Sequence, residues 1–282
     1  MSNFLFLGGD MRFVYAAKKM SERYDCFLYG FDDAPPFTCL PVLREITKCG
    51  NLVLPLPASR DGFTINAPFS ALPLPLSIIP QAVDEGGTVY CGRSFPELER
   101  ICKEHNLKLV DYFEREELAV MNAVPTAEGT LELAIRERKR TIFGSEILIS
   151  GFGRISKVLA KYLTAMGADV TITARKYSDL AWAEIAGCKT VHLSEISGEL
   201  PRFDIVINTV PSPIFGADDV KLLKNDCLVI DLASKPGFED AEEAKKDGVK
   251  VVWALSLPGK TAPETAGYII ANTIINIIAE NA

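Results

Sequence analysis

Histidine is scarce in this chain, which has 2 histidines among 282 residues. His105 lies in a predicted helix, and His192 lies in a predicted strand remote from the glycine turn described below, so we interpret both as structural. No serine–histidine–acid arrangement and no set of metal ligands stands out, which argues against the common forms of nucleophilic and metal-dependent catalysis. We therefore expect an organic cofactor to carry any chemistry.

Paired cysteines and membrane signals are also missing. The 7 cysteines are odd in number and scattered, and none belongs to a Cys-x-x-Cys pair, which favours free thiols in a reducing cytosol over disulfides or a zinc site. The first ten residues lack the features of a signal peptide. The most apolar stretch, 268–279, is too short to span a bilayer and predicts a buried helix. The sequence indicates a cytoplasmic protein without membrane segments.

Basic residues are outnumbered by acidic ones: the formal net charge is -7, and no lysine- or arginine-rich run is present. Proteins that bind nucleic acid need a basic patch to meet the phosphates. The charge balance therefore argues against a nucleic-acid partner.

Short apolar runs alternate with amphipathic helical stretches along the whole chain. This alternation predicts an α/β protein with parallel sheets. We expect a crossover between two domains near Thr126, which can cap a helix with Glu128 in its first turn. The predicted domains are 1–125 and 126–267. The predicted strands are 4–7, 26–29, 52–56, 88–91 and 107–110 in the first half, and 147–150, 170–173, 190–193, 205–208, 228–231 and 251–254 in the second.

A glycine turn follows the first strand of the second half and opens a helix. In dinucleotide sites the first glycine makes the tight turn, the second lets the backbone approach the pyrophosphate, and the helix start holds the anion. The third position is Ser156 here, where glycine or alanine is usual. The alternative, a turn without a ligand, is weaker because this turn lies inside a βαβ unit. The expected cofactor-binding residues of the turn are Gly151, Phe152, Gly153, Arg154 and Ile155.

The end of the next predicted strand discriminates between nicotinamide cofactors. NAD sites place an acid there, and NADP sites supply arginine for the 2′-phosphate. This chain has Ala174, Arg175 and Lys176. Hydrogen bonds to charged groups contribute about 1.5–3 kcal/mol each, so we predict NADP over NAD by about tenfold or more, with NAD still possible. The alternative is that both cations face solvent.

Polar and small residues also follow the later strands of the second half. Ligands of such sheets lie beyond the carboxyl ends of the strands, so these loops are expected to face the cofactor. Each loop alone could be turn chemistry, and their joint placement carries the prediction. The residues are Asn208, Thr209, Val210, Pro211, Asp231, Leu232, Ala233, Ser234, Pro258 and Gly259.

The first half offers a second glycine turn, Gly8-Gly9-Asp10-Met11-Arg12, between a strand and a helix. Its helix start and Arg12 suit a carboxylate better than a pyrophosphate. The alternative is a turn with a surface Asp–Arg pair. Ser59 and Arg60, after the third predicted strand, would add a hydroxyl group and a second guanidinium.

With these residues in hand, the whole chain resembles the family of dipicolinate synthase A subunits. Ser156 is the departure, because relatives commonly have glycine at that position. The matching segments are Gly8-Gly9-Asp10 with Arg12, Phe113-Glu114-Arg115, 122–129, the glycine turn with Arg154, Ile207-Asn208-Thr209, Asp231-Leu232-Ala233-Ser234, Leu257-Pro258-Gly259 and Ala262-Pro263-x-Thr265-Ala266-Gly267.

The resemblance implies a formate/glycerate-dehydrogenase-like pair of domains. The first would be a Rossmann-like or flavodoxin-like substrate domain, with the C-terminal helix 268–282 packed back on it, and the second an NAD(P)-binding Rossmann domain. The implied reaction is NADP-dependent oxidation of dihydrodipicolinate, derived from 4-hydroxy-tetrahydrodipicolinate, to pyridine-2,6-dicarboxylate. The implied partner is the flavoprotein-like B subunit of dipicolinate synthase, in the mother cell of a sporulating bacterium, and a homo-oligomer is expected.

A ring with two carboxylates needs cationic or helix-start sites. The expected base is Glu128 or Asp10, provided that one is desolvated. Two alternatives stay open: another two-domain dehydrogenase that acts on a 2-hydroxy or amino acid, and an NADP-holding protein that is inactive without the B subunit. The expected substrate-binding residues are Gly9, Arg12, Ser59, Arg60, Thr126 and Lys260.

Overall fold

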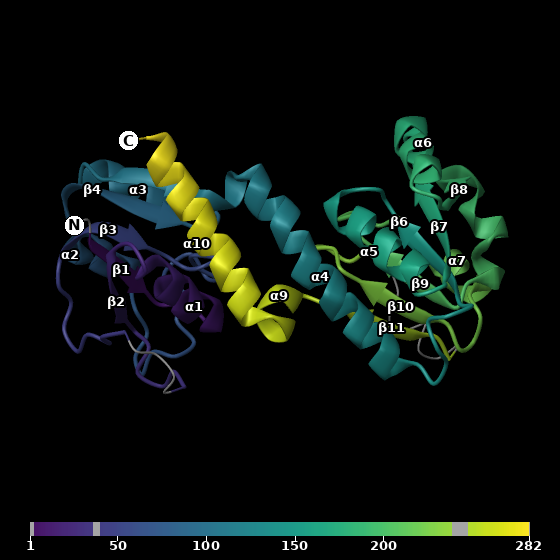
Figure 1. The fold of residues 1–282 in the computed structure, drawn as a ribbon, viewed down its shortest axis with the longest axis horizontal. Helices are drawn as coiled ribbons and strands as arrows, with labels where there is room; N and C mark the ends of the chain where they lie inside the picture. Colours follow the sequence, from purple (N-terminus) through teal and green to yellow (C-terminus); the bar gives the residue numbers. More distant parts are fainter. Residues whose placement is uncertain (1–2, 36–39, 239–247, 282) are drawn as a thin grey trace. The chain divides into compact units, whose positions relative to one another are not determined.

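The computed structural model describes residues 3–35, 40–238 and 248–281, which form two compact units (Figure 1). Unit 1 comprises Met1–Asn122 and Ala262–Ala282, and unit 2 comprises Ala123–Thr261. The division thus falls three residues before the expected boundary, inside helix α4 (Glu116–Glu137), and the returning segment starts at Ala262. No helix in the described residues is long and apolar enough to cross a membrane.

Unit 1 is built on a parallel sheet with the strand order β2-β1-β3-β4-β5. This order is the flavodoxin-like one, which has its switch point between the first and third strands. The register places Leu5 opposite both Phe27 and Leu52. The strands are β1 (Asn3–Leu7), β2 (Asp25–Tyr29), β3 (Cys49–Val53), β4 (Val83–Cys91) and β5 (Lys108–Asp111).

Helices cover both faces of the unit 1 sheet, and the central strand β1 is apolar at every position after Asn3. On one face, Phe4 and Phe6 pack with helix α1 (Met11–Met20) and helix α10 (Pro263–Glu280), which includes the predicted buried helix. On the other face, Leu5 and Leu7 pack with residues of the helical segments η1 (Leu76–Ile78), α2 (Ile79–Ala82) and α3 (Pro96–Glu104). The short η2 (Tyr112–Glu114) leads into α4.

Unit 2 contains a six-stranded parallel sheet with the order β11-β10-β9-β6-β7-β8. Counted from β6, this is the 3-2-1-4-5-6 arrangement of dinucleotide-binding sheets, which confirms the predicted fold class. The strands are β6 (Glu146–Ser150), β7 (Asp169–Ala174), β8 (Lys189–His192), β9 (Ile205–Asn208), β10 (Leu228–Asp231) and β11 (Lys250–Trp253). The helical segments are α5 (Arg154–Ala165), α6 (Tyr177–Ile185), η3 (Leu193–Gly198), η4 (Leu200–Arg202), α7 (Ala217–Leu222) and α9 (Leu257–Thr261).

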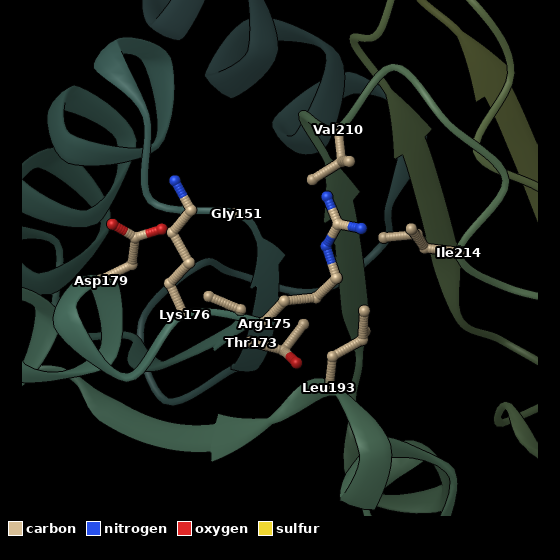
Figure 2. A pocket seen from close by; sticks show the side chains of 9 residues that line it. Gly151, Thr173, Arg175, Lys176, Asp179, Leu193, Val210 and Ile214 are labelled. Carbon is tan, nitrogen blue, oxygen red and sulfur yellow. The ribbon is translucent and has the colours of Figure 1, made fainter.

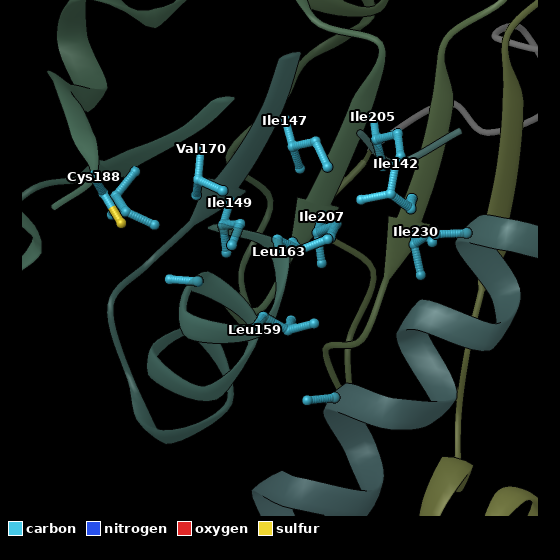
Figure 3. Packing of buried hydrophobic residues seen from close by; sticks show 14 of the residues in the cluster. Ile142, Ile147, Ile149, Leu159, Leu163, Val170, Cys188, Ile205, Ile207 and Ile230 are labelled. Carbon is cyan, nitrogen blue, oxygen red and sulfur yellow. The ribbon is translucent and has the colours of Figure 1, made fainter. Parts of the chain in front are cut away.

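The unit 2 sheet is buried on both faces. Figure 3 shows one face, where Ile149 and Ile207 of the strands pack with Leu159 and Leu163 of α5. The opposite face is a separate apolar cluster that includes Leu148, Val206, Phe203 and Phe215. Packing on both faces holds the carboxyl ends of β6, β7, β9 and β10 in one rigid row.

The predicted helix start at Thr126 is wrong. Helix α4 begins at Glu116 and continues through Pro125, so Thr126 lies in the helix interior and its carbonyl accepts a hydrogen bond from Thr130 Oγ1 (2.8 Å). An interior proline removes one helix hydrogen bond, but the neighbouring Ala123 and Ala127 are fully buried, and this packing sustains the helix.

Gly129, also within α4, has a packing role that requires glycine. A Cβ atom at Gly129 would lie 2.7 Å from Thr261 Oγ1 and 3.1 Å from Leu257 Cβ. Helix α9, which carries both of those residues, therefore packs directly against the backbone of α4.

Candidate functional site

The glycine turn after β6 lies at the switch point of the unit 2 sheet, between β9 and β7. Gly151 has φ +80°, and a Cβ atom there would approach Val210 Cγ2 (3.0 Å) and Thr209 Oγ1 (3.1 Å). Gly151 is therefore required both by its backbone conformation and by the close approach of the loop after β9.

Gly153 is the N-cap of α5, and no side chain of the described residues caps this helix. An added Cβ at Gly153 would meet no described atom within 4 Å, so there is open space beside the start of α5. Such a helix start is an anion site, and its geometry fits a pyrophosphate. The buried Ser156 is accommodated because its Oγ lies 2.9 Å from Thr209 Oγ1, which joins α5 to the loop after β9.

Replacing Gly153 with alanine should weaken cofactor binding without destabilising the fold. The backbone of Gly153 (φ -83°, ψ -165°) suits alanine, and its Cβ has free space. The added methyl would occupy the position of the approaching pyrophosphate, so we expect about tenfold lower NADPH affinity, with stability changed by less than about 0.5 kcal/mol. NADPH fluorescence titration and thermal unfolding measure both quantities. Gly198→Ala, at another position with open space, is the control. Unchanged NADPH affinity in G153A would contradict the proposal that the pyrophosphate binds beside Gly153.

Beside this turn lies a cavity of about 240 Å³ that opens at the carboxyl ends of β6 and β7 (Figure 2). It brings together five residues predicted from the sequence and four that sequence reasoning missed. The predicted ones are Gly151, Ala174, Arg175, Lys176 and Val210, and the missed ones are Thr173, Asp179, Leu193 and Ile214.

The cavity has an apolar part and a charged part. Leu193, Val210 and Ile214 give apolar walls of the kind that hold an adenine ring, and Figure 2 shows Arg175 extending toward two of them. Within the described part of the chain, neither Arg175 nor Lys176 forms an ion pair. Both cations are therefore available to an anionic ligand.

Asp179 adds a carboxylate to the cavity, although no carboxylate directly follows β7. Asp179 lies in the first turn of α6, where the helix dipole favours an acid, and it lines the same cavity. The cavity therefore presents two cations and one carboxylate, which still favours an anion.

Asn208 was predicted to contact the cofactor, but its side chain is fully buried and its hydrogen-bonding capacity is used within the protein. Its Oδ1 accepts from Ser150 Oγ (2.6 Å) and from the Val210 amide (3.0 Å). Its Nδ2 donates to the Val210 carbonyl (3.0 Å) and to Asp231 Oδ1 (2.8 Å). Asn208 thus connects β6, the loop after β9 and β10.

Asp231 extends this network into the next loop. Its Oδ1 also accepts from the Ala233 amide (3.0 Å), and its Oδ2 accepts from the Gly237 amide (2.7 Å). A Cβ atom at Gly237 would lie 2.1 Å from Asn208 Nδ2, so only glycine fits there. Asn208 and Asp231 therefore shape the loops after β9 and β10, and their side chains are not free to bind a ligand.

The other predicted cofactor residues lie near these loops but do not line the cavity. Pro258 is buried and Gly259 half-buried within α9, and Ala233 is buried with its carbonyl accepting from Trp253 Nε1 (2.9 Å). The remaining members show varied exposure: Pro211, Ser234, Gly153 and Arg154 are exposed, Thr209, Leu232 and Ile155 are half-buried, and Phe152 is buried.

In unit 1, the turn after β1 lies at the switch point of its sheet, beside β3. Gly9 has φ +118°, and Asp10 caps α1 by accepting from the Arg12 amide (3.0 Å). Arg12 Nε and Nη2 bind the two oxygens of Asp10 (2.9 and 2.8 Å), and Nη2 also donates to the Leu56 carbonyl (2.7 Å). This is the Asp–Arg pair weighed as the alternative, although it is largely buried. Nη1 has no hydrogen-bond partner among the described residues.

Ser59 and Arg60 follow β3 at the same end of the sheet. Ser59 Oγ accepts from the Gly62 amide (2.9 Å) and donates to Asp61 Oδ1 (3.1 Å), so it belongs to a local turn. Hydrogen bonds from Thr64 hold the pKa of Asp61 well below its usual range. Arg60 is exposed and lines a cavity of about 420 Å³ in unit 1.

The remaining substrate and catalytic candidates belong to unit 2. Glu128 and Lys260 are exposed, on α4 and α9 respectively, and Thr126 is half-buried on α4. The candidates for substrate binding are thus divided between the two units. In the described ranges, no three histidine, cysteine or acidic side chains cluster in a way that could hold a metal ion.

The 6 described cysteines are buried, and burial raises the pKa of each thiol, to about 12 for Cys26 and Cys227 and about 11 for Cys102. The thiolate is the reactive form, so a raised pKa leaves little of it at pH 8. We expect these cysteines to resist iodoacetamide at pH 8 in the folded protein and to react once it is unfolded in urea. Peptide mass mapping assigns each site, and rapid native alkylation at any of the six would contradict the prediction.

Family models match both units of the chain. Residues 3–113 match the N-terminal domain of the dipicolinate synthase A subunit, and residues 121–235 match the NAD-binding domain of D-isomer-specific 2-hydroxyacid dehydrogenases. The second match covers the glycine turn and the cavity beside it, so the nucleotide that this geometry fits is a nicotinamide dinucleotide.

Known proteins match the chain end to end. It is 34% identical to the A subunit of dipicolinate synthase from Bacillus subtilis over 97% of this chain and 95% of that protein. The crystal structure of the Bacillus halodurans A subunit superposes with a TM-score of 0.88 (31% identity, 99% and 98% coverage). That of the Bacillus subtilis protein gives 0.86 (32% identity, 99% and 96% coverage). The chain belongs to the family of dipicolinate synthase A subunits and is a nicotinamide-nucleotide-dependent oxidoreductase.

Proposed function

We propose that this protein catalyses the NADP-dependent oxidation of dihydrodipicolinate, derived from 4-hydroxy-tetrahydrodipicolinate, to pyridine-2,6-dicarboxylate. The observation that carries the proposal is a dinucleotide cavity lined by two cations, Arg175 and Lys176, in a chain that matches the A subunit of dipicolinate synthase over almost its whole length. When bound, NADP would supply the acceptor for the hydride that the ring loses.

The residues of unit 2 divide the work of holding the cofactor. The start of α5 behind Gly153 binds the pyrophosphate through its backbone N–H groups, in the open space beside Gly153. Arg175 and Lys176 bind the 2′-phosphate, and the apolar walls hold the adenine. Asn208 and Asp231 keep the surrounding loops in place through their buried hydrogen bonds.

The substrate carries two carboxylates, so it needs cationic or helix-start partners. We assign this role to Arg60 and Lys260, which are exposed, and to Nη1 of Arg12, with Gly9, Ser59 and Thr126 as further contacts. Glu128 is the better candidate for the base, because both oxygens of Asp10 are held by Arg12; Glu128 itself is exposed, so the expected desolvation would have to come from the bound substrate and cofactor. Loss of a hydride and a proton makes the ring aromatic, so the site needs only to orient the ring and take the proton.

The resemblance supports further proposals about context. The protein would work with the flavoprotein-like B subunit, in the mother cell of a sporulating bacterium, and would form a homo-oligomer. A second candidate function also involves the B subunit. The protein would bind NADP and would catalyse the reaction only when the B subunit completes the site.

Turnover by the purified chain, with and without the B subunit, tests the reaction. The substrate is generated in place from pyruvate and aspartate semialdehyde by the upstream synthase, and NADP or NAD is supplied. NADPH and dipicolinate that rise together support the proposal. Product only with the B subunit supports the second candidate. No product with either cofactor, even with the partner present, refutes the assigned reaction.

The preference for NADP depends on the two cations at the end of β7. The double variant R175A/K176A removes both partners of the 2′-phosphate, so we expect NADPH affinity to fall about tenfold or more, with NADH affinity changed less than about twofold. Fluorescence titration measures both constants. Lys161→Ala, which removes one exposed cation on α5, is the control for loss of positive charge elsewhere in unit 2. Equal affinities of the wild-type protein for the two cofactors would refute the preference.

A further inference from the structure

His192 lies beside the residues that we propose bind the 2′-phosphate, although it is far from them in sequence. It ends β8, and the parallel register places it opposite Ala174, the last residue of β7. The β7–β8 ladder stops at this pair. The carbonyl of Arg175, one residue beyond it, therefore has no strand partner on that side.

The imidazole of His192 contacts the Arg175 carbonyl, which lies just beyond the end of the β7–β8 ladder. Its Nδ1 accepts a hydrogen bond from the Ser194 amide (3.3 Å) and lies 2.7 Å from Ser194 Oγ. An Nδ1 that accepts from an amide carries no proton, so the proton is on Nε2. Nε2 lies 3.1 Å from the Arg175 carbonyl oxygen and donates to it.

A second contact holds the other side of the same segment. The ring of Tyr177, the first residue of α6, stacks on the His192 ring with centroids 4.9 Å apart and planes 17° apart. His192 thus contacts the residues on both sides of Lys176, through the Arg175 carbonyl and the Tyr177 ring. These ties fix the backbone from which Arg175 and Lys176 reach into the cavity.

We propose that His192 is a positioning residue for cofactor selection: it orders the Arg175–Lys176 segment so that both cations meet the 2′-phosphate. This inference rests on the proposed preference for NADP. A preordered segment loses less conformational freedom on binding, so its cations bind the phosphate more tightly. NAD has no 2′-phosphate, and its binding does not depend on this order.

Two amide variants separate the two hydrogen bonds of the ring. Asparagine can accept from the Ser194 amide as Nδ1 does, but it does not reach the Arg175 carbonyl. Glutamine places its amide N–H near the position of Nε2 and can restore the bond to Arg175. The loss of one neutral hydrogen bond corresponds to about fivefold in affinity. We therefore expect His192→Asn to lower NADPH affinity about fivefold with NADH affinity unchanged, and His192→Gln to stay near wild type.

NADPH and NADH fluorescence titrations of the full chain, with thermal unfolding of each variant, make the test. Selective loss of NADPH affinity in H192N, with rescue in H192Q, supports the role. Parallel loss of both cofactors with a lower melting temperature overturns it, because it shows a purely structural residue. If R175A/K176A loses the preference and H192N keeps it, only this inference fails. If the wild-type protein has no preference, the proposed cofactor choice and this inference both fail.

Discussion

Replacing Asn208 with alanine is expected to destabilise unit 2 by about 3–4 kcal/mol and to abolish measurable NADPH binding. The amide makes four hydrogen bonds in a fully buried position. Alanine would remove the partner of the Val210 amide, the short hydrogen bond of Ser150 Oγ and one of the two hydrogen bonds to Asp231 Oδ1. A buried polar group that loses its partner costs about 1–3 kcal/mol, and a network loses more than one such bond. The loop after β9, which lines the cavity through Val210 and Ile214, would then lose the hydrogen bonds that hold it in place.

Urea unfolding followed by tryptophan fluorescence measures this effect, because Trp182 and Trp253 both belong to unit 2. Asn225→Ala is the matched control, since Asn225 is exposed in the same unit and its loss should change stability by less than about 0.5 kcal/mol. Wild-type stability with lost cofactor binding in N208A would instead indicate that Asn208 contacts the cofactor directly.

Gly267→Ala should destabilise unit 1 by about 3 kcal/mol, although alanine is normally the better helix residue by about 1 kcal/mol. Gly267 lies where α10 crosses α1, and an added Cβ would be 2.3 Å from the Arg12 carbonyl oxygen and 2.7 Å from Tyr15 Cβ. A backbone oxygen cannot turn away as a side chain can, so the two helices must separate. Overpacking of this kind costs about 1–3 kcal/mol, and the lost helix contacts add to it.

Unit 1 contains no tryptophan, so alkylation of Cys26 under urea, with circular dichroism, reports its unfolding. Gly50→Ala is the control in the same unit, because its Cβ would meet Asn3 Oδ1 at an ordinary 3.4 Å. G267A should shift the Cys26 transition to lower urea, and G50A should leave it nearly unchanged. A stabilised G267A would show that α10 does not pack as closely on α1 as the structure has it.

Most strands were predictable because both sheets are buried on both faces. A central parallel strand is then apolar at most positions, so 147–149 and 205–207 stand out as continuous apolar runs. The glycine turn was predictable for a similarly local reason: Gly151 and Gly153 serve the backbone of one strand–helix junction. The helix start at Thr126 was missed because burial of the neighbouring alanines outweighs the local preference of a proline and a threonine.

The sequence by itself determined the order of most strands, the glycine turn after β6 and the two cations after β7, because each depends on residues adjacent along the chain. Only the tertiary structure decided which side chains meet across strands. It placed Asp179, Leu193 and Ile214 in the cavity, used the polar atoms of Asn208 internally, and aligned His192 with the end of β7. These contacts depend on strand register and loop packing between segments far apart in sequence, so no local sequence pattern predicts them.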